Sequence, residues 1–142
     1  MEKIIAIDYG LKRTGIAYAE SPLYIAHPLK TINTHELFPF LSKFLNENEI
    51  IKVVLGEPKS LDGSPTDLTN HVIQLKKKLT KTYSNLKVVF YDERFTSKIA
   101  QQSMVISGVK KKQRQKKGNL DLIAAVIILQ SYLEANNNIT GL

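Results

Sequence analysis

A chain of 142 residues with 43% hydrophobic side chains is long enough for one domain with a substantial core, so we expect a single domain, 1–142. It contains no cysteine, which excludes a disulfide framework and a thiolate metal site and suits a reducing compartment. The N-terminus lacks the layout of a signal peptide, and the longest apolar run, 122–129, is far below the roughly 18 residues of a membrane span. We therefore expect a soluble, cytoplasmic protein.

The N-terminal part of the chain predicts three strands. Residues 3–8 and 14–19 are mostly apolar, as expected of strands, and are joined by the short connection DYGLKR. This arrangement predicts a hairpin. A third extended piece, 24–32, is interrupted by Pro28. Because proline cannot donate a hydrogen bond to a neighbouring strand, this piece is expected at the edge of a sheet.

Helices and strands then alternate. Asn33 is expected to cap a first helix, with Glu36 three residues on, and Ser64 to cap a long second helix. The remaining expected elements are strands at 50–55 and 86–91, a helix at about 97–106, a last helix at about 120–135, and a frayed tail at 136–142. This order predicts an α/β fold with a largely parallel sheet, to which the hairpin adds antiparallel strands.

The net charge of +7 comes from one segment. Residues 94–120 carry eight basic side chains and no acid, whereas the rest of the chain has twelve basic and thirteen acidic side chains. This asymmetry indicates a polyanionic partner, most often nucleic acid, although a solvated charged loop is the simpler alternative. No aromatic residue occurs between Phe95 and Tyr132, so the segment should hold phosphates rather than stack on unpaired bases.

Three acids are candidates for one metal site. Asp8 ends the first strand and Glu93 follows the last, and ligands gather at the carboxyl ends of strands in open α/β sheets. On the last helix, Asp121 shares the apolar face of Ala124, Ala125, Ile128 and Tyr132. Clustered carboxylates repel one another, and bound Mg²⁺ or Mn²⁺ removes that penalty. Two such ions would activate water and stabilise the leaving oxygen of a phosphodiester.

Each acid also has a simpler explanation when taken singly. Asp8 suits a turn, Glu93 could pair with Arg94, and Asp121 suits a first helical turn. Other chemistries have little support, since the chain has no GxSxG, GxxxxGK[ST] or GxGxxG motif. The three histidines, at 27, 35 and 71, lack metal-ligand spacing. A phosphate hairpin of the actin-like and sugar-kinase ATPases is a further alternative, but the chain is too short for their two lobes.

Four ordered motifs resemble the YqgF family of Holliday-junction-resolvase-like proteins, which are regarded as pre-16S ribosomal RNA nucleases. They are DYGLKRTGIA (8–17), GEP with DGS (56–58 and 62–64), DERFTS (92–97) and KGNLDLIAAVIILQSYL (117–133). The resemblance runs from residue 3 to about 134. It implies a ribonuclease H-like fold, with a mixed five-stranded sheet flanked by helices, and metal-dependent phosphodiester cleavage that processes the 5′ end of pre-16S ribosomal RNA.

Position by position, the resemblance implies Asp8, Glu93 and Asp121 as the catalytic, metal-binding acids. Glu57 departs from it, because an apolar residue is expected between the glycine and the proline. The expected phosphate contacts are Lys12, Arg13, Arg94, Lys110, Lys111, Lys112, Arg114, Lys116 and Lys117.

Two other functions stay open at this point. One is a non-catalytic nucleic-acid or ribosome-binding module, and the other is a DNA resolvase of the Holliday-junction type. The expected partner is nucleic acid, with a ribosomal RNA precursor favoured over DNA and with ribosomal particles as a further partner. The chain is expected to be a monomer or a weak dimer without a membrane partner.

Overall fold

The computed structural model describes residues 1–58, 66–93 and 117–140, with the side chains of the last segment described from 122 to 136. The elements in chain order are β1 (Lys3–Asp8), β2 (Arg13–Glu20), β3 (His27–Asn33), the 3₁₀ turn η1 (Thr34–Glu36), α1 (Leu37–Glu47), β4 (Ile50–Glu57), α2 (Asp67–Thr82), β5 (Lys87–Asp92) and α5 (Lys117–Thr140). The expected helix at 97–106 and the part of the basic segment from 94 to 116 lie outside the described residues. No helix in the described part combines the length and apolarity needed to cross a membrane.

The five strands form one mixed sheet in the order β3-β2-β1-β4-β5. The hairpin β1–β2 and the pair β2–β3 are antiparallel, whereas β1–β4 and β4–β5 are parallel. The predicted mixed sheet and the edge position of the strand that contains Pro28 are therefore confirmed. Because β1, β4 and β5 run in the same direction, their carboxyl ends meet at one edge of the sheet, hereafter the carboxyl edge.

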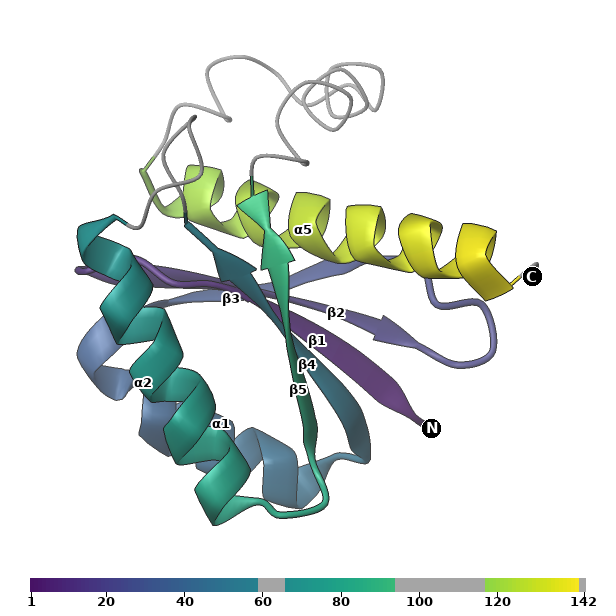
Figure 1. Cartoon of the computed structure of the whole chain (residues 1–142), viewed down its shortest axis with the longest axis horizontal. Helices are drawn as coiled ribbons and strands as arrows, with labels where there is room; N and C mark the ends of the chain where they lie inside the picture. Colours follow the sequence, from purple (N-terminus) through teal and green to yellow (C-terminus); the bar gives the residue numbers. More distant parts are fainter. Residues whose placement is uncertain (59–65, 94–116, 141–142) are drawn as a thin grey trace.

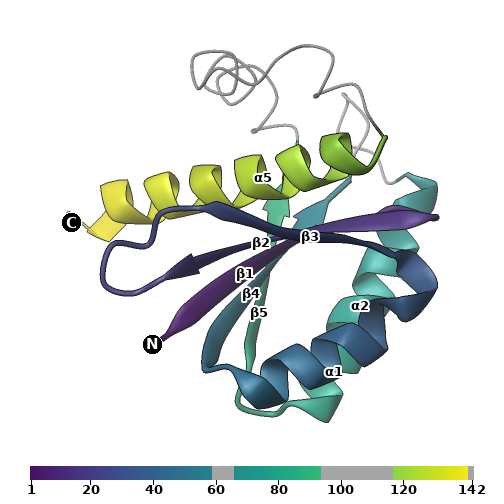
Figure 2. The same ribbon diagram turned by 180° about the vertical axis from the view of Figure 1, so that it is seen from behind.

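Helices cover both faces of the sheet. α5 crosses one face, and α1 and α2 lie together on the other (Figures 1 and 2). Side chains alternate along each strand, so Ile5 and Ile7 of β1 pack into the core under α1 and α2, while Ile4 and Ala6 pack under α5. Alanines are frequent on the α5 face and let the helix approach the sheet closely; those of the strands are Ala6, Ala17 and Ala19.

Asn33 stands at the N-cap position of the 3₁₀ turn η1, whereas the N-cap of α1 itself is Glu36. Asn33 makes no side-chain capping bond and instead ends β3, where it pairs with Arg13 of β2. A single 3₁₀ turn follows, and α1 begins only at Leu37. The backbone pairing of β2 with β3 continues to Asn33 and keeps that residue extended, which local sequence signals do not reveal.

The second helix begins two residues after the predicted start. Its cap is Thr66, whose backbone N–H donates to Oγ1 of Thr69 at 2.8 Å, and Thr69 Oγ1 in turn donates to the carbonyl of Pro58 at 2.8 Å. Ser64, the expected cap, lies outside the described residues. The bond from Thr69 ties the start of α2 to the end of β4, and this long-range contact selects Thr66 over Ser64.

The last helix is longer than predicted, because α5 continues to Thr140 through the expected tail. Within it, the side-chain amide of Asn136 donates to the carbonyl of Tyr132 at 2.9 Å, so this asparagine supports the helix instead of breaking it. Lys52 of β4 fastens α5 to the sheet, since its Nζ donates to the Tyr132 hydroxyl at 2.6 Å.

Candidate functional site at the carboxyl edge

Asp8 is the last residue of β1 and lies half-buried at the carboxyl edge. The alternation along β1 places its side chain on the face covered by α5. Its Cα partner on β2 is Gly15, and on the other side Gly56 follows Leu55, the partner of Ile7. Asp8 is therefore flanked by glycines on both neighbouring strands, Gly15 of β2 and Gly56 of β4.

Glu93 follows β5 directly and reaches back over the end of β4. A Cβ placed on Gly56 would lie 2.6 Å from Oε1 of Glu93 and 2.7 Å from Cδ1 of Ile128, which belongs to α5. The Glu93 carboxylate thus occupies the space that the missing side chain leaves, between the sheet and α5. Gly56 is one strand away from Asp8, about 4.8 Å across the sheet. The structure brings Asp8 and Glu93 to the same edge and the same face although 85 positions separate them.

The third candidate acid, Asp121, belongs to α5, but its side chain is outside the described part. The helical face to which it was assigned does pack on the sheet, because Ala125 and Ile128 are buried. Among the described side chains, no three His, Asp or Glu form a group that could hold a metal ion. The joint site of the three acids therefore stays a prediction, of which two members have the expected placement.

Two of the expected phosphate contacts are described. Arg13 is the first residue of β2, and the alternation along that strand places it on the α5 face, as Asp8 is. Lys12 is exposed in the loop just before it. The side chains of the other seven lie outside the description; they are Arg94, Lys110, Lys111, Lys112, Arg114, Lys116 and Lys117.

Glu57 stands on the opposite face of the sheet. It follows Gly56 in β4, so the alternation turns it toward α2, and its Cα partner is Asp92. Glu57, the one departure noted from the family motifs, thus lies on the face opposite to Asp8 and Glu93. The three histidines are all exposed and lie on three different elements, β3, η1 and α2.

The loop after Asp8 is held by two threonines that the sequence analysis missed. Thr34 Oγ1 donates to the carbonyl of Gly10 at 2.6 Å, and its backbone N–H donates to the carbonyl of Lys12 at 2.9 Å. Its hydroxyl also lies 2.9 Å from that of Thr14, which is fully buried. Gly10 is required here, because a Cβ would collide with the carbonyl oxygen of Arg13. The one signal in the sequence for these hydrogen bonds of Thr34 is Thr14, a polar residue within a predicted apolar strand.

Thr34→Val should loosen this loop. The substitution keeps the shape of the side chain and removes the hydroxyl, leaving the carbonyl of Gly10 and the hydroxyl of Thr14 without this partner. We expect the free energy of unfolding in urea to fall by about 1–3 kcal/mol. The matched control is Thr80→Val, whose hydroxyl bonds only to carbonyls in the exposed part of α2 and should cost less than about 0.5 kcal/mol. Equal losses of unfolding free energy in the two variants would contradict a special role of the Thr34 hydroxyl in holding this loop.

Tyr91 borders the same face of the edge. It is the Cα partner of Gly56 and packs edge-on against Tyr132, with ring centroids 6.3 Å apart. Burial raises the pKa of the Tyr91 phenol, and the negative charges of Glu134 and Asp92 raise it further. The phenol therefore stays protonated at neutral pH and adds no negative charge to the two carboxylates.

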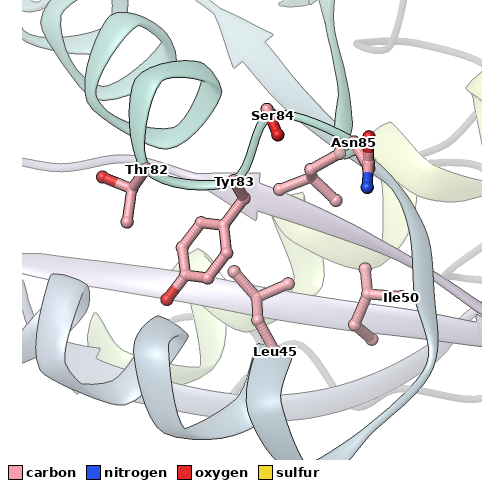
Figure 3. A pocket seen from close by; sticks show the side chains of 7 residues that line it. Leu45, Ile50, Thr82, Tyr83, Ser84 and Asn85 are labelled. Carbon is pink, nitrogen blue, oxygen red and sulfur yellow. The ribbon is translucent and has the colours of Figure 1, made fainter.

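Among the residues that the structure describes, two hollows lie at opposite edges of the sheet. The larger, of about 340 Å³, is near the amino ends of β4 and β5, where Leu45, Ile50 and Tyr83 line it (Figure 3). It is far from Asp8, at the edge where ligands of open α/β sheets do not usually bind. The smaller, of about 240 Å³, includes Tyr9, the residue directly after Asp8.

Comparison with known families identifies the chain. The family model described as RuvX, Holliday junction resolvase, matches residues 2–135. The chain belongs to the RuvX family. A RuvX relative from Phocaeicola vulgatus, named "Putative pre-16S rRNA nuclease", is 40% identical over 139 residues, which cover 98% of this chain and 100% of the relative. One of the same name from Flavobacterium johnsoniae is 43% identical over 135 residues, covering 95% and 98%. The relatives carry the description that the sequence analysis gave for the YqgF family, pre-16S ribosomal RNA nuclease, so the predicted family is confirmed.

The fold matches solved structures of RuvC. RuvC from Thermus thermophilus in complex with a Holliday junction substrate superposes with a TM-score of 0.61 at 15% identity, covering 94% of this RuvX chain and 95% of RuvC. A second structure of the same protein gives 0.54 at 11% identity, covering 94% and 96%. At this level of identity the likeness concerns the fold, which is ribonuclease H-like as predicted.

Proposed function

We propose that this chain is a metal-dependent endonuclease that cleaves a phosphodiester bond of a ribosomal RNA precursor, near the 5′ end of 16S ribosomal RNA. The observation that supports the proposal is that Asp8 and Glu93 lie at the same edge and on the same face of the sheet, with Gly56 leaving room for the Glu93 carboxylate. The names of the relatives support the choice of substrate.

The donor set fits a hard divalent cation. Asp8 and Glu93 offer carboxylate oxygens on the same face of the sheet, and Mg²⁺ and Mn²⁺ prefer oxygen ligands. Asp121, on the helix that covers this face, would be the third ligand. When bound there, the cation would supply charge stabilisation at the phosphate and lower the pKa of a water molecule.

The residues of the chain would orient the substrate around these acids. Arg13, on the same face as Asp8, would hold two oxygens of a phosphate by two parallel hydrogen bonds, a geometry that arginine favours. Lys12, exposed beside it, adds a mobile positive charge. The excess of basic residues in 94–120 would attract the rest of the nucleic acid backbone, so that binding should weaken steeply with salt.

A DNA resolvase is the second candidate, because the family description names Holliday junctions and RuvC shares the fold. Symmetric cutting of a four-way junction needs two copies of the site, whereas cutting one RNA strand needs one. A non-catalytic binding module is the third, and it predicts binding without turnover.

A panel of substrates, each tested with and without metal, separates the three candidate functions. The panel consists of a fragment spanning the 5′ boundary of pre-16S RNA, the DNA of the same sequence and a four-way DNA junction, each with Mg²⁺, Mn²⁺ or chelator. We expect specific cutting of the RNA with either metal and none with chelator, analysed on a denaturing gel. Paired cuts in the junction alone would favour the resolvase. Salt-sensitive binding with no cut in any lane would leave only the binding module.

A further inference from the structure

The hollow behind Tyr9 joins aromatic rings to positive charge at the carboxyl edge. Its lining comes from the loop after β1, from the start of α1 and from one side of α2. The rings of Tyr9 and His71 are nearly parallel, with an interplanar angle of 16° and centroids 6.1 Å apart. Phe38 closes another side, and the Lys78 ammonium lies 4.0 Å from the centroid of its ring. This is a platform for a flat, electron-rich ring with negative charge next to it.

We propose that this hollow binds one unpaired nucleobase of the substrate strand, next to the cleavage position. The inference rests on the proposed function for its substrate and names the part of that substrate which the site reads. Aromatic side chains bind single-stranded nucleic acid by stacking on its bases, whatever their sequence. The volume of about 240 Å³ lies below the roughly 300–1,000 Å³ of pockets for drug-sized ligands, so it suits one base better than a larger group.

The position of the hollow links it to the two acids. Tyr9 directly follows Asp8, the last residue of β1, so adjacent positions carry a carboxylate on the α5 face and an aromatic ring on the α2 face. The loop after Asp8 is held in place by the bonds of Thr34 to the carbonyls of Gly10 and Lys12. A nucleic acid strand that crosses the carboxyl edge from the α5 face to the α2 face would therefore pass both Asp8 and the mouth of the hollow. Binding a base there would fix which phosphate faces the two acids.

The charge of α2 complements a nucleic acid backbone. The helix has a single acid, Asp67, in its first turn and four lysines in its second half, namely Lys76, Lys77, Lys78 and Lys81. Lys78 borders the hollow, and Lys77 and Lys81 are exposed beyond it. Phosphates next to a base in the hollow would meet these ammonium groups. The basic segment at 94–120 has no aromatic residue except Phe95, so the hollow supplies the stacking that the segment lacks.

The test omits one base at a time from a bound strand. Fluorescein-labelled 12-nucleotide RNA and DNA strands, each with one abasic position, are titrated with the full chain in the presence of chelator, so that no strand is cut. We expect one position, or two neighbours, at which base omission weakens binding about five- to 100-fold, against small effects elsewhere. A duplex of the same sequence should bind without this dependence. The RNA and DNA arms show whether the sugar matters.

Variants assign the dependence to the hollow. In Tyr9→Ala and His71→Ala the sensitive position should disappear, whereas Tyr9→Phe should keep it because a ring remains. His71 is exposed, so its replacement leaves the core intact even if Tyr9→Ala is poorly folded. The matched control is His27→Ala, which replaces an exposed histidine of the edge strand β3 whose ring contacts Tyr18 of β2, and it should keep the sensitive position.

The outcomes separate this inference from the proposed function. Two results would overturn the base site even if the RNA is cut. One is that the unmodified chain binds all abasic strands equally well, and the other is that the sensitive position persists in His71→Ala. A profile that depends on His71 in a protein that cuts nothing would keep the base site and overturn the nuclease.

Discussion

Asp8→Asn should reduce cleavage about 10³-fold or more, equivalent to about 4 kcal/mol of transition-state stabilisation. Asparagine has nearly the same shape but no negative charge, so it would hold a divalent cation much less well. Glu93→Gln should have an effect of the same order, since both acids lie on one face of the carboxyl edge. Asp121→Asn tests the third member in the same way. The measurement is single-turnover cleavage of the RNA from the substrate panel with saturating protein.

The chain offers a matched control for charge removal. Glu57→Gln neutralises an acid of the same edge that stands on the α2 face. We expect it to cleave within about threefold of the unmodified protein. A loss as large as that of Asp8→Asn would show that general charge at this edge matters, rather than the face on which the acid lies.

A second readout separates metal binding from activity. A cation that binds only the folded chain raises the midpoint of thermal unfolding in a concentration-dependent manner. Mg²⁺ or Mn²⁺ should therefore raise the midpoint of the unmodified protein and of Glu57→Gln, but much less that of Asp8→Asn or Glu93→Gln. An unchanged midpoint in the unmodified protein at millimolar metal would argue against a metal site at these acids.

After the substitutions of the acids, Gly56→Ala is expected to have the largest effect, although it changes only one hydrogen to a methyl group. The new Cβ would lie 2.6 Å from Oε1 of Glu93 and 2.7 Å from Cδ1 of Ile128, so both neighbours must move. A displacement of about 1 Å at a reacting centre can cost about 10²-fold in rate. Forcing a methyl group into a packed space costs about 1–3 kcal/mol of stability. Cleavage and urea unfolding of the same preparation measure the two effects.

The double variant Gly56→Ala with Ile128→Val locates the cause of the loss. Valine lacks Cδ1, so it relieves the contact with α5 and leaves the one with Glu93. Stability should recover in part, while cleavage should stay low. Recovery of cleavage in the double variant would mean that a shift of α5 is responsible and that Glu93 does not need its present position. Ile128→Val alone is the control for the lost methyl group, with an expected cost of about 0.5–1.5 kcal/mol.

Local patterns in the sequence predicted the strands well and the helix starts poorly. The apolar runs at 3–8 and 50–55 correspond to β1 and β4, because burial on both faces needs continuous apolar residues. Asn33 caps a 3₁₀ turn in place of α1, and Thr66 caps α2 in place of Ser64, because the backbone pairing of Asn33 and the bond from Thr69 to Pro58 involve other segments. A helix start depends on which partner reaches the first turn, and neighbouring residues do not decide that.

The sequence by itself determined that acids end two strands, that positive charge gathers near one of them, and that the chain resembles the RuvX relatives. The first two are properties of residue type and of position along the chain, whereas the resemblance rests on the four ordered motifs. Only the tertiary structure decided that Glu93 folds over Gly56 beside Asp8, that Glu57 stands on the other face, and that the ring of Tyr9 meets His71. The physical reason is that these relations depend on strand order and register, which arise when distant segments pack against one another.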